Sequence, residues 1–259
     1  MNPEVHQNKL SVIMPALNEE QNITDAIDGV LDAFDFFKID GEIIAINDGS
    51  SDRTGSLIEQ KIKENPGRLR MIRHEKPKGI GASFWEGVEE VSGDTIVMLP
   101  GDNENDPRET LRYYRLLEHV DMVIPFVFNR EVRPLFRNIL SLIYRFIINT
   151  TFLVNFNYTN GTILCRKSIL KELKTRSKGF FFQTDILVRS AKKGYLFAEV
   201  PYKLGVRKKG GSKAVSFPSF FQVARGYLKL VRDYYFTNKK HLKESFSHDS
   251  QTAIRRANN

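Results

Sequence analysis

An acidic loop directly follows a short apolar run in the first half of the chain. Thr95–Leu99 is rich in β-branched residues and predicts a buried strand, and the loop after it carries Asp102, Glu104 and Asp106. Carboxylate oxygens are the ligands that hard divalent cations such as Mg²⁺ and Mn²⁺ prefer. In open α/β sheets, ligands bind at the carboxyl ends of the strands. The loop therefore predicts a divalent-cation site, and an acidic turn that caps a helix at Pro107 is the structural alternative.

Polar and acidic groups follow two more predicted strands. Leu10–Met14 leads into Pro15-Ala16-Leu17-Asn18-Glu19-Glu20, and Glu42–Ile46 leads into Asn47-Asp48-Gly49-Ser50-Ser51-Asp52. If these strands are parallel, their polar ends share one edge of the sheet with Asp102. A carboxylate at this edge can accept paired hydrogen bonds from a nucleobase or a ribose. A simple turn cap is the structural alternative for the second motif.

A glycine-bearing loop precedes a predicted helix at Lys78-Gly79-Ile80-Gly81-Ala82-Ser83. By itself this is a weak phosphate-loop pattern. The chain contains neither GxxxxGK[ST] nor GxGxxG, so it supports neither a P-loop ATPase nor a dinucleotide-binding Rossmann enzyme.

The elements that position these loops alternate between strand and helix. Besides the three strands above, the apolar patterns predict strands at Leu69–Ile72 and Val120–Phe126, and helices at Glu19–Phe37, Asp52–Lys63, Gly81–Val91 and Pro107–Glu118. Such alternation is typical of parallel strands joined by right-handed crossovers. We therefore expect an α/β fold in which helices flank a mixed, mainly parallel sheet.

The charge is distributed unevenly along the chain. Residues 1–125 carry 13 Lys and Arg against 24 Asp and Glu, and residues 126–259 carry 26 against 7. We expect an acidic half that holds a metal and a basic half that faces anions, which are phosphates, an acidic membrane surface or nucleic acid. The single cysteine, Cys165, excludes a disulfide framework. The polar start of the chain and the lack of a membrane-spanning apolar segment favour a cytoplasmic protein, peripheral at the inner face of a membrane.

Two amphipathic segments characterise the second half. Residues 135–154 have Phe136 and Ile143 on one face, and residues 216–236 show similar spacing. Both are predicted to be helices that either face the core or lie on a membrane surface, where aromatic and basic side chains suit an anionic interface. Residues 237–259 are polar and are predicted to be a disordered tail.

Taken together, the motifs resemble family 2 glycosyltransferases of the GT-A, Rossmann-like fold. The resemblance is greatest to the polyprenyl-phosphate branch, which includes dolichol-phosphate mannosyltransferases. The second half adds four motifs to those quoted above: Gly179-Phe180-Phe181-Phe182-Gln183-Thr184-Asp185, Ala191-Lys192-Lys193-Gly194-Tyr195, Val200-Pro201 and Arg207-Lys208-Lys209-Gly210-Gly211-Ser212-Lys213. The resemblance spans about residues 9–215, so residues 1–215 are predicted to form the catalytic domain.

The resemblance implies a role for each motif in the first half. It implies that a UDP- or GDP-linked sugar is bound by Pro15, Ala16, Asn18, Glu19, Asp48, Gly79 and Gly81. It also implies a divalent cation, Mg²⁺ or Mn²⁺, held by Asp102 with help from Glu104, that stabilises the diphosphate as it leaves. Asp102 is therefore a predicted catalytic residue, and the reaction is expected to be a single inverting displacement.

The chain departs from the family pattern at four positions. Pro100 stands where the family commonly has the first aspartate of a D-x-D pair, and Glu104 stands at a glutamine. Asn47 replaces an aspartate, and Ile80 replaces a lysine between the two glycines. These departures leave the nucleotide and the sugar open, and they make weak or absent metal dependence an alternative.

The acceptor determines which other residues act. A polyprenyl phosphate is already anionic and needs cations rather than a general base, and the candidates are Arg130, Arg133, Arg137, Arg207 and Lys213. A sugar hydroxyl in glycan synthesis needs a base, for which Asp185 is the catalytic candidate. An ion pair between Asp185 and Arg189 is the structural alternative. A non-catalytic module that binds anions or a membrane is the third hypothesis, and the absence of a recognisable nucleic-acid motif argues against a nucleic-acid partner.

Overall fold

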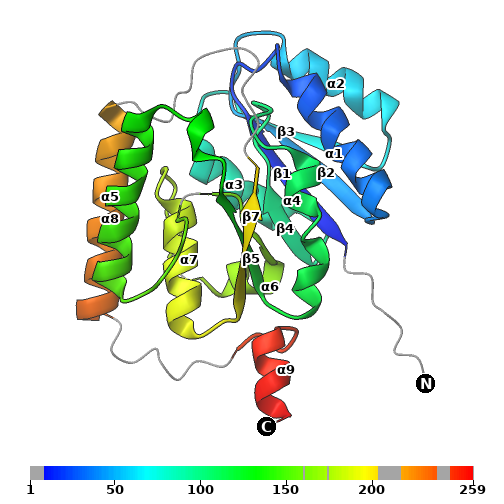
Figure 1. The fold of residues 1–259 in the computed structure, drawn as a ribbon. Helices are drawn as coiled ribbons and strands as arrows, with labels where there is room; N and C mark the ends of the chain where they lie inside the picture. The colour runs from blue at the N-terminus through cyan, green and yellow to red at the C-terminus, as the bar shows by residue number, and fades with distance from the viewer. Residues whose placement is uncertain (1–8, 160, 174, 204–216, 238–245, 259) are drawn as a thin grey trace.

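The computed structural model describes residues 9–159, 161–173, 175–203, 217–237 and 246–258. Their centre is a seven-stranded sheet (Figure 1) with the strand order β3-β2-β1-β4-β6-β5-β7. The strands are β1 Leu10–Ala16, β2 Gly41–Asn47, β3 Leu69–Arg73, β4 Thr95–Met98, β5 Met122–Val127, β6 Leu164–Arg166 and β7 Phe197–Tyr202. The helices are α1 Ile23–Phe37, α2 Thr54–Glu64, α3 Ile80–Glu90, α4 Pro107–Leu111, α5 Leu135–Phe152, α6 Lys167–Glu172, α7 Phe182–Lys193, α8 Phe217–Arg232 and α9 Gln251–Ala257.

The sheet is mixed and mainly parallel, which confirms the fold class predicted from the sequence. β1 pairs in parallel with β2 and β4, β2 with β3, and β5 with β7. β6 runs antiparallel between β4 and β5. All five predicted strands are present, whereas β6 and β7 were not predicted. β6 has only three residues, and β7 lies at the edge of the sheet with only Val200 and Tyr202 buried, so neither has a strong apolar pattern.

Each face of the sheet has its own apolar core. Side chains alternate along β1, so that Ile13 joins the core formed with α3, α5 and α7, while Val12 and Met14 join the core formed with α1 and α2. This double burial explains why the central strands are continuous apolar runs. It also holds the carboxyl ends of β1, β2 and β4 in a fixed arrangement.

The predicted helix at Pro107–Glu118 is divided in the structure. α4 ends at Leu111, and a separate 3₁₀ helix covers Tyr114–Glu118. The Asp106 carboxylate caps α4 by accepting a hydrogen bond from the N–H of Arg108 at 2.8 Å. This residue of the acidic loop therefore has the capping role that the structural alternative describes.

α5 and α8 lie side by side along one edge of the molecule (Figure 1), where the hydroxyl groups of Thr151 and Tyr227 are 2.9 Å apart. Only Ile148 and Phe152 of α5 are buried, and Phe136 near its start is 67% exposed. The interpretation of α5 as an ordinary core-facing helix is therefore wrong for most of its length. Within the described ranges, every helix falls short of the length or the apolar character that spanning a membrane requires.

α8 combines the two roles that the sequence left open, because one face packs on the core and another exposes aromatic side chains. Val223, Tyr227 and Val231 are partly buried against the core. Phe220 and Phe221 point away from it, and Phe221 is 74% exposed. α8 thus closes one side of the core and adds exposed aromatic side chains to the edge that it shares with α5.

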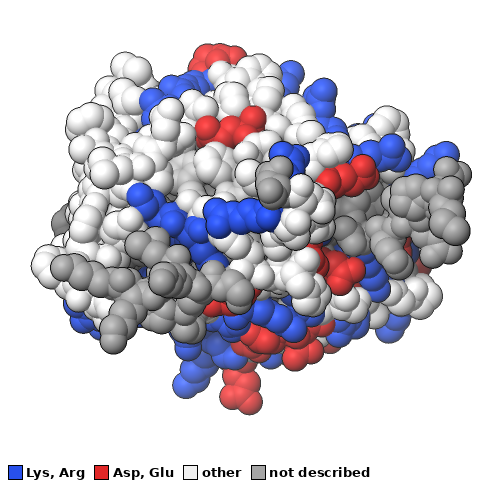
Figure 2. Space-filling view, turned by 90° about the horizontal axis from the view of Figure 1, so that it is seen from below, with Lys and Arg blue, Asp and Glu red and all other residues white. Residues whose placement is uncertain are grey.

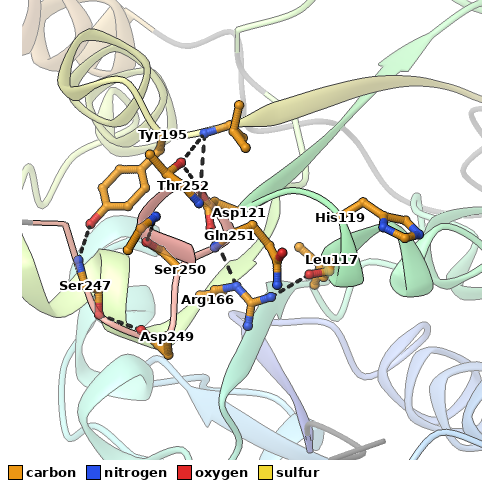
Figure 3. A network of polar contacts seen from close by, with 12 residues as sticks. Leu117, His119, Asp121, Arg166, Tyr195, Ser247, Asp249, Ser250, Gln251 and Thr252 are labelled. Atoms are coloured by element: carbon orange, nitrogen blue, oxygen red, sulfur yellow. Dashed lines mark hydrogen bonds and ion pairs between the residues drawn. The ribbon is translucent and has the colours of Figure 1, made fainter. Parts of the chain in front are cut away.

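The prediction of a disordered tail over 237–259 is wrong for residues 246–258, which fold against the sheet and include α9 (Figure 1). The N–H groups of Gln251 and Thr252 donate to the carboxylate of Asp121 at 2.6 and 3.1 Å (Figure 3). Residues 238–245 and 259 lie outside the described residues. The polar composition was misleading because this segment is fixed by hydrogen bonds to a buried carboxylate, which apolar patterning does not reveal.

Asp121 is the centre of this attachment. It is fully buried just before β5, and it also accepts a hydrogen bond from the N–H of Leu196 at 3.2 Å. The Nε of Arg166 lies 3.7 Å from the carboxylate, and an Arg166 N–H donates to the carbonyl of Leu117 (Figure 3). A single buried charge thus joins the start of β5, β6 and the C-terminal segment.

We expect Asp121→Ala to lower the free energy of unfolding by about 3–5 kcal/mol, because it removes the ion-pair partner of the buried Arg166 guanidinium and the acceptor of the N–H groups of Leu196, Gln251 and Thr252. Urea unfolding followed by circular dichroism measures this change. Asp40→Ala, at an exposed aspartate, is the matched control and should change stability by less than about 0.5 kcal/mol. A loss below about 1 kcal/mol for Asp121→Ala would contradict the central role of this carboxylate.

Candidate active site

A cavity of about 950 Å³ lies at the carboxyl ends of β1, β2 and β4. The carboxyl end of β1 contributes Pro15 to its wall, and the loops after β2 and β4 contribute Asp48 and Asp102. The rest of the wall comes from residues 77–80, from residues 176–180, and from α5 and α8. The structure therefore brings together at one edge of the sheet the motifs that the sequence places far apart.

Asp48 is held by three hydrogen bonds at the end of β2. Its Oδ1 lies 2.6 Å from Nδ1 of His74 and accepts the N–H of Lys78 at 2.8 Å, and its Oδ2 accepts the N–H of Gly79 at 2.9 Å. Burial by itself raises the pKa of Asp48, but these hydrogen bonds outweigh it and hold the pKa below its ordinary value. The cavity thus has a fixed carboxylate on its wall.

Gly79 makes this arrangement possible. Its backbone has a φ of +92°, which side-chain-bearing residues rarely adopt, and this conformation directs its N–H to Asp48 at the start of α3. Gly79 also lines the cavity.

At the end of β1 and in the loop after it, some residues line the cavity and others hold the loop in place. Pro15, Ala16 and Glu19 line the cavity. Asn18 is not among the lining residues; its N–H donates to Oγ of Ser50 at 3.0 Å, and its side-chain oxygen accepts the N–H of Ser51 at 2.9 Å. Asn18 therefore holds the loop after β1 against the loop after β2 rather than facing a ligand directly.

The acidic loop places Asp102 and Glu104 on the wall of the same cavity. The N–H of Glu104 donates to Oδ1 of Asp102 at 3.1 Å, which closes the loop on itself. Pro100, at the position of the missing aspartate, also lines the cavity. Among the described residues, no three His, Cys, Asp or Glu side chains gather closely enough to hold a metal ion by themselves.

Gly81 has a different role from the one predicted. It does not line the cavity, and a Cβ at this position would lie 2.5 Å from the carbonyl oxygen of Lys178. The absence of a side chain allows the backbone of Lys178 and Gly179 to pack directly on the start of α3. The structure thus gives Gly81 a packing role beside the cavity, and its binding of the nucleotide stays a prediction.

The segment 176–180 is attached to α3 by Trp85. The indole N–H of Trp85 donates to the carbonyl of Ser177 at 2.9 Å, and the Arg176 guanidinium lies 4.8 Å from the indole ring centre. Arg176 also pairs with Glu89 at 2.5 Å. These contacts hold Arg176 and Lys178 at the cavity wall, a role that no local sequence pattern indicated.

The predicted phosphate-binding cations separate into three groups. Arg137 lines the large cavity, where it is joined by Arg225 and Lys229 of α8. Arg130 and Arg133 instead border a small separate pocket beside the start of α5. Arg207 and Lys213 lie outside the described residues. The i, i+4 spacing of Arg225 and Lys229 on an amphipathic helix was visible in the sequence, but not the surface that they face.

Asp185 is not brought to the cavity. It lies in α7, is 3% exposed, and its Oδ1 accepts a hydrogen bond from Nε of Arg189 at 2.8 Å. Arg189 also pairs with Asp233, which follows α8, at 2.8 Å. Burial raises the pKa of Asp185, with Arg189 opposing the effect. The ion pair that was the structural alternative is therefore the arrangement that the structure shows.

The fold and the position of the cavity define the class of protein. Glucosyl-3-phosphoglycerate synthase from Mycobacterium tuberculosis, solved with Mn²⁺, UDP and phosphoglyceric acid, has a TM-score of 0.67 at 20% identity, with coverage of 86% of this chain and 78% of that chain. A structure of the same synthase with Mg²⁺ and UDP has a TM-score of 0.65 at 20% identity, covering 86% and 79%. The GT-A glycosyltransferase fold is thus confirmed.

The chain belongs to glycosyl transferase family 2, whose model matches residues 11–174. A dolichol-phosphate mannosyltransferase from Pyrococcus furiosus is 25% identical over 236 residues, which cover 86% of this chain and 64% of that protein. An undecaprenyl-phosphate 4-deoxy-4-formamido-L-arabinose transferase from Salmonella choleraesuis is 29% identical over 143 residues, which cover 55% of this chain and 44% of that protein. The chain therefore spans less than two thirds of the length of these relatives, and their names confirm the resemblance to the polyprenyl-phosphate branch.

We expect Gly81→Ala to destabilise the protein by about 1–3 kcal/mol, because the added methyl group must displace the backbone at Lys178. Thermal or urea unfolding measures the change. Gly29→Ala in α1 is the matched control, since a Cβ there meets only the ring of Pro107 at an ordinary 3.5 Å. Equal stability of the two variants would contradict the packing role of Gly81.

Proposed function

We propose that this protein is an inverting glycosyltransferase that moves a sugar from a nucleotide-diphosphate sugar to a polyprenyl-phosphate-type lipid at a membrane surface. One observation carries the proposal: a single cavity joins the carboxylates of the strand-end loops to the cations Arg137, Arg225 and Lys229. The helices that supply these cations also expose large apolar side chains. The cavity thus combines a donor end, an acceptor end and a lipid-facing rim.

The donor end is formed by the loops after β1 and β2. Asp48 and Glu19 would bind the nucleoside, with Pro15, Ala16 and Gly79 completing the wall around it. Asp48 is suited to this task because its three hydrogen bonds keep it ionised and fixed in place. The solved GT-A neighbours that contain UDP support a nucleotide ligand for this fold.

Asp102 and Glu104 fit a divalent cation. Mg²⁺ is usually held by one or two protein carboxylates, with substrate phosphates and water as the other ligands, so a site of two carboxylates is sufficient. When bound, the cation would neutralise the charge that develops on the departing diphosphate. The neighbours solved with Mn²⁺ or Mg²⁺ support a divalent cation here.

The acceptor end would gather a phosphate between the cations of α5 and α8. Arginine matches a phosphate through two parallel hydrogen bonds, so Arg137 and Arg225 are suited to orient it, with Lys229 as a further positive charge. One phosphate oxygen attacks the anomeric carbon while the bond from that carbon to the nucleoside diphosphate breaks. The attacking oxygen is already anionic, so the step needs no general base, in agreement with the position of Asp185 away from the cavity.

The rim formed by α5 and α8 supports a lipid acceptor. Phe136, Phe146 and Phe221 are each more than two-thirds exposed on these helices. Seen from below, the side of the molecule on which α5 and α8 lie shows mostly uncharged atoms with some Lys and Arg among them (Figure 2). Exposed aromatic side chains next to basic ones are typical of helices at an anionic membrane interface. In this proposal residues 1–215 form the catalytic domain, residues 216–236 complete the lipid-facing rim, and the protein is peripheral at the cytoplasmic face of a membrane.

Transfer assays with a panel of UDP- and GDP-sugars test the proposal. Each donor is offered a short polyprenyl phosphate and, as the control acceptor, the matching polyprenol without phosphate. Transfer to the phosphate alone is the expected result. Donor binding without transfer to either lipid would overturn the acceptor assignment, and failure to bind any donor would overturn the glycosyltransferase proposal.

We expect Asp102→Asn to lower kcat by at least about 100-fold and to remove the stimulation by Mn²⁺, because it removes a charge on which the diphosphate site depends. Initial rates over a series of Mn²⁺ concentrations measure both effects. Asp106→Asn is the matched control, because Asp106 caps α4 and an asparagine can keep that cap. Metal-stimulated turnover in the Asp102 variant would contradict the assignment.

We expect the double variant Phe136→Ser and Phe221→Ser to bind vesicles of mixed neutral and anionic lipid at least about tenfold more weakly, since each ring contributes about 1.5–3 kcal/mol when buried in lipid. Sedimentation with the vesicles measures the affinity. Phe36→Ser is the control, because Phe36 is 60% exposed on α1, away from this rim. Equal binding by the two variants would contradict a membrane role for α5 and α8.

A further inference from the structure

The side chain of His74 lies behind Asp48 and is almost completely buried, with 1% of its surface exposed. It follows β3, and its backbone N–H donates to the carbonyl of Asn47 at 2.9 Å, which fixes its backbone beside the end of β2, directly before Asp48. No sequence motif singles out this histidine. It does not line the cavity, so any effect on a ligand must act through its neighbours.

Both ring nitrogens of His74 face carboxylates. Nδ1 lies 2.6 Å from Oδ1 of Asp48, and Nε2 lies 3.0 Å from Oε2 of Glu86. A carboxylate only accepts hydrogen bonds, so either ring nitrogen has an acceptor in place for the hydrogen that it carries. Lys78 braces the far end by donating from Nζ to Glu86 at 2.9 Å. The ring is thus held between two acceptors and cannot rotate away from Asp48.

These contacts determine how many further hydrogen bonds the Asp48 carboxylate can accept from a ligand. A carboxylate oxygen has about two lone-pair positions. Oδ1 uses both, for His74 and for the N–H of Lys78, whereas Oδ2 uses one, for the N–H of Gly79. In the described part of the chain Asp48 has no further partner, so one acceptor position remains.

We propose that His74 positions Asp48 to accept a single N–H from the base of the donor, so that the site selects uridine rather than guanosine; this inference rests on the proposed function. Uracil has one N–H on its pairing edge, between two carbonyl oxygens. Guanine presents two adjacent donors, N1–H and the 2-amino group, and one of them would be buried without an acceptor. Cytosine and adenine present an unprotonated ring nitrogen beside their amino group, and the lone pair of this nitrogen repels a carboxylate.

Calorimetric titration with nucleoside diphosphates tests the inference on the whole protein, without requiring transfer. UDP is expected to bind at least tenfold more tightly than GDP, CDP or ADP. N3-methyl-UDP, which lacks the N–H, is expected to bind at least tenfold more weakly than UDP, because a hydrogen bond to a charged acceptor is lost.

Two variants show whether His74 positions Asp48 or only supports the fold. His74→Gln is expected to reduce the preference for UDP over N3-methyl-UDP to about threefold or less. If His74 only supported the fold, the substitution would lower the affinity for both nucleotides by the same factor. His119→Gln is the matched control, because His119 is exposed and does not line the cavity. Circular dichroism checks that both variants are folded.

Each outcome bears on a different statement. GDP binding as tightly as UDP, or equal binding of UDP and N3-methyl-UDP, would overturn the inference and leave the proposed function standing. An unchanged preference in a folded His74→Gln would overturn the positioning role. Absence of binding by every nucleotide would overturn the proposed function together with the inference.

Discussion

The burial of ionised carboxylates at the ends of strands is the constraint on which the rest of this structure depends. A carboxylate that leaves water costs several kcal/mol unless its oxygens receive hydrogen bonds. Asp48 meets this requirement with His74 and with the N–H groups of Lys78 and Gly79. The backbone before α3 must follow those oxygens, and in doing so it forms one wall of the cavity.

Buried carboxylates also need hydrogen-bond donors at the opposite edge of the sheet, where the strands begin. Glu42, near the start of β2, accepts a hydrogen bond from the hydroxyl of Ser11 at 2.7 Å and one from the N–H of Ser92 at 2.6 Å. Asp121, before β5, holds the C-terminal segment. Neither carboxylate lines the described cavity, so at the amino ends buried charge joins segments of the fold. At the carboxyl ends, where loops diverge around a hollow, it also faces a ligand site.

The cavity itself is electrically divided. Its carboxylates come from the acidic first half of the chain, and Arg137, Arg225 and Lys229 come from the basic second half. Packing of α5 and α8 against the sheet brings the two halves together, and the Asp185–Arg189–Asp233 pairs fasten α7 to the segment after α8. A buried ion pair outside the cavity thereby helps to hold α8, with Arg225 and Lys229, in place.

Local patterns in the sequence were sufficient for strands β1 to β5 and for the loops that line the cavity after β1, β2 and β4. Alternating strand and helix signals predicted β1 to β5, and polar residues after the apolar runs predicted that Asp48 and Asp102 would share one edge. These features depend on neighbours within a few residues of each other, so spacing and composition determine them.

Only the tertiary structure decided which side chains from distant segments meet. It separated Arg130 and Arg133 from the cavity, placed Asp185 away from it, and gave Gly81 a packing role. It also placed His74 behind Asp48 and folded the polar end of the chain onto Asp121. Such contacts arise when a buried polar group must find partners wherever the packed chain brings them, and no local pattern encodes that position.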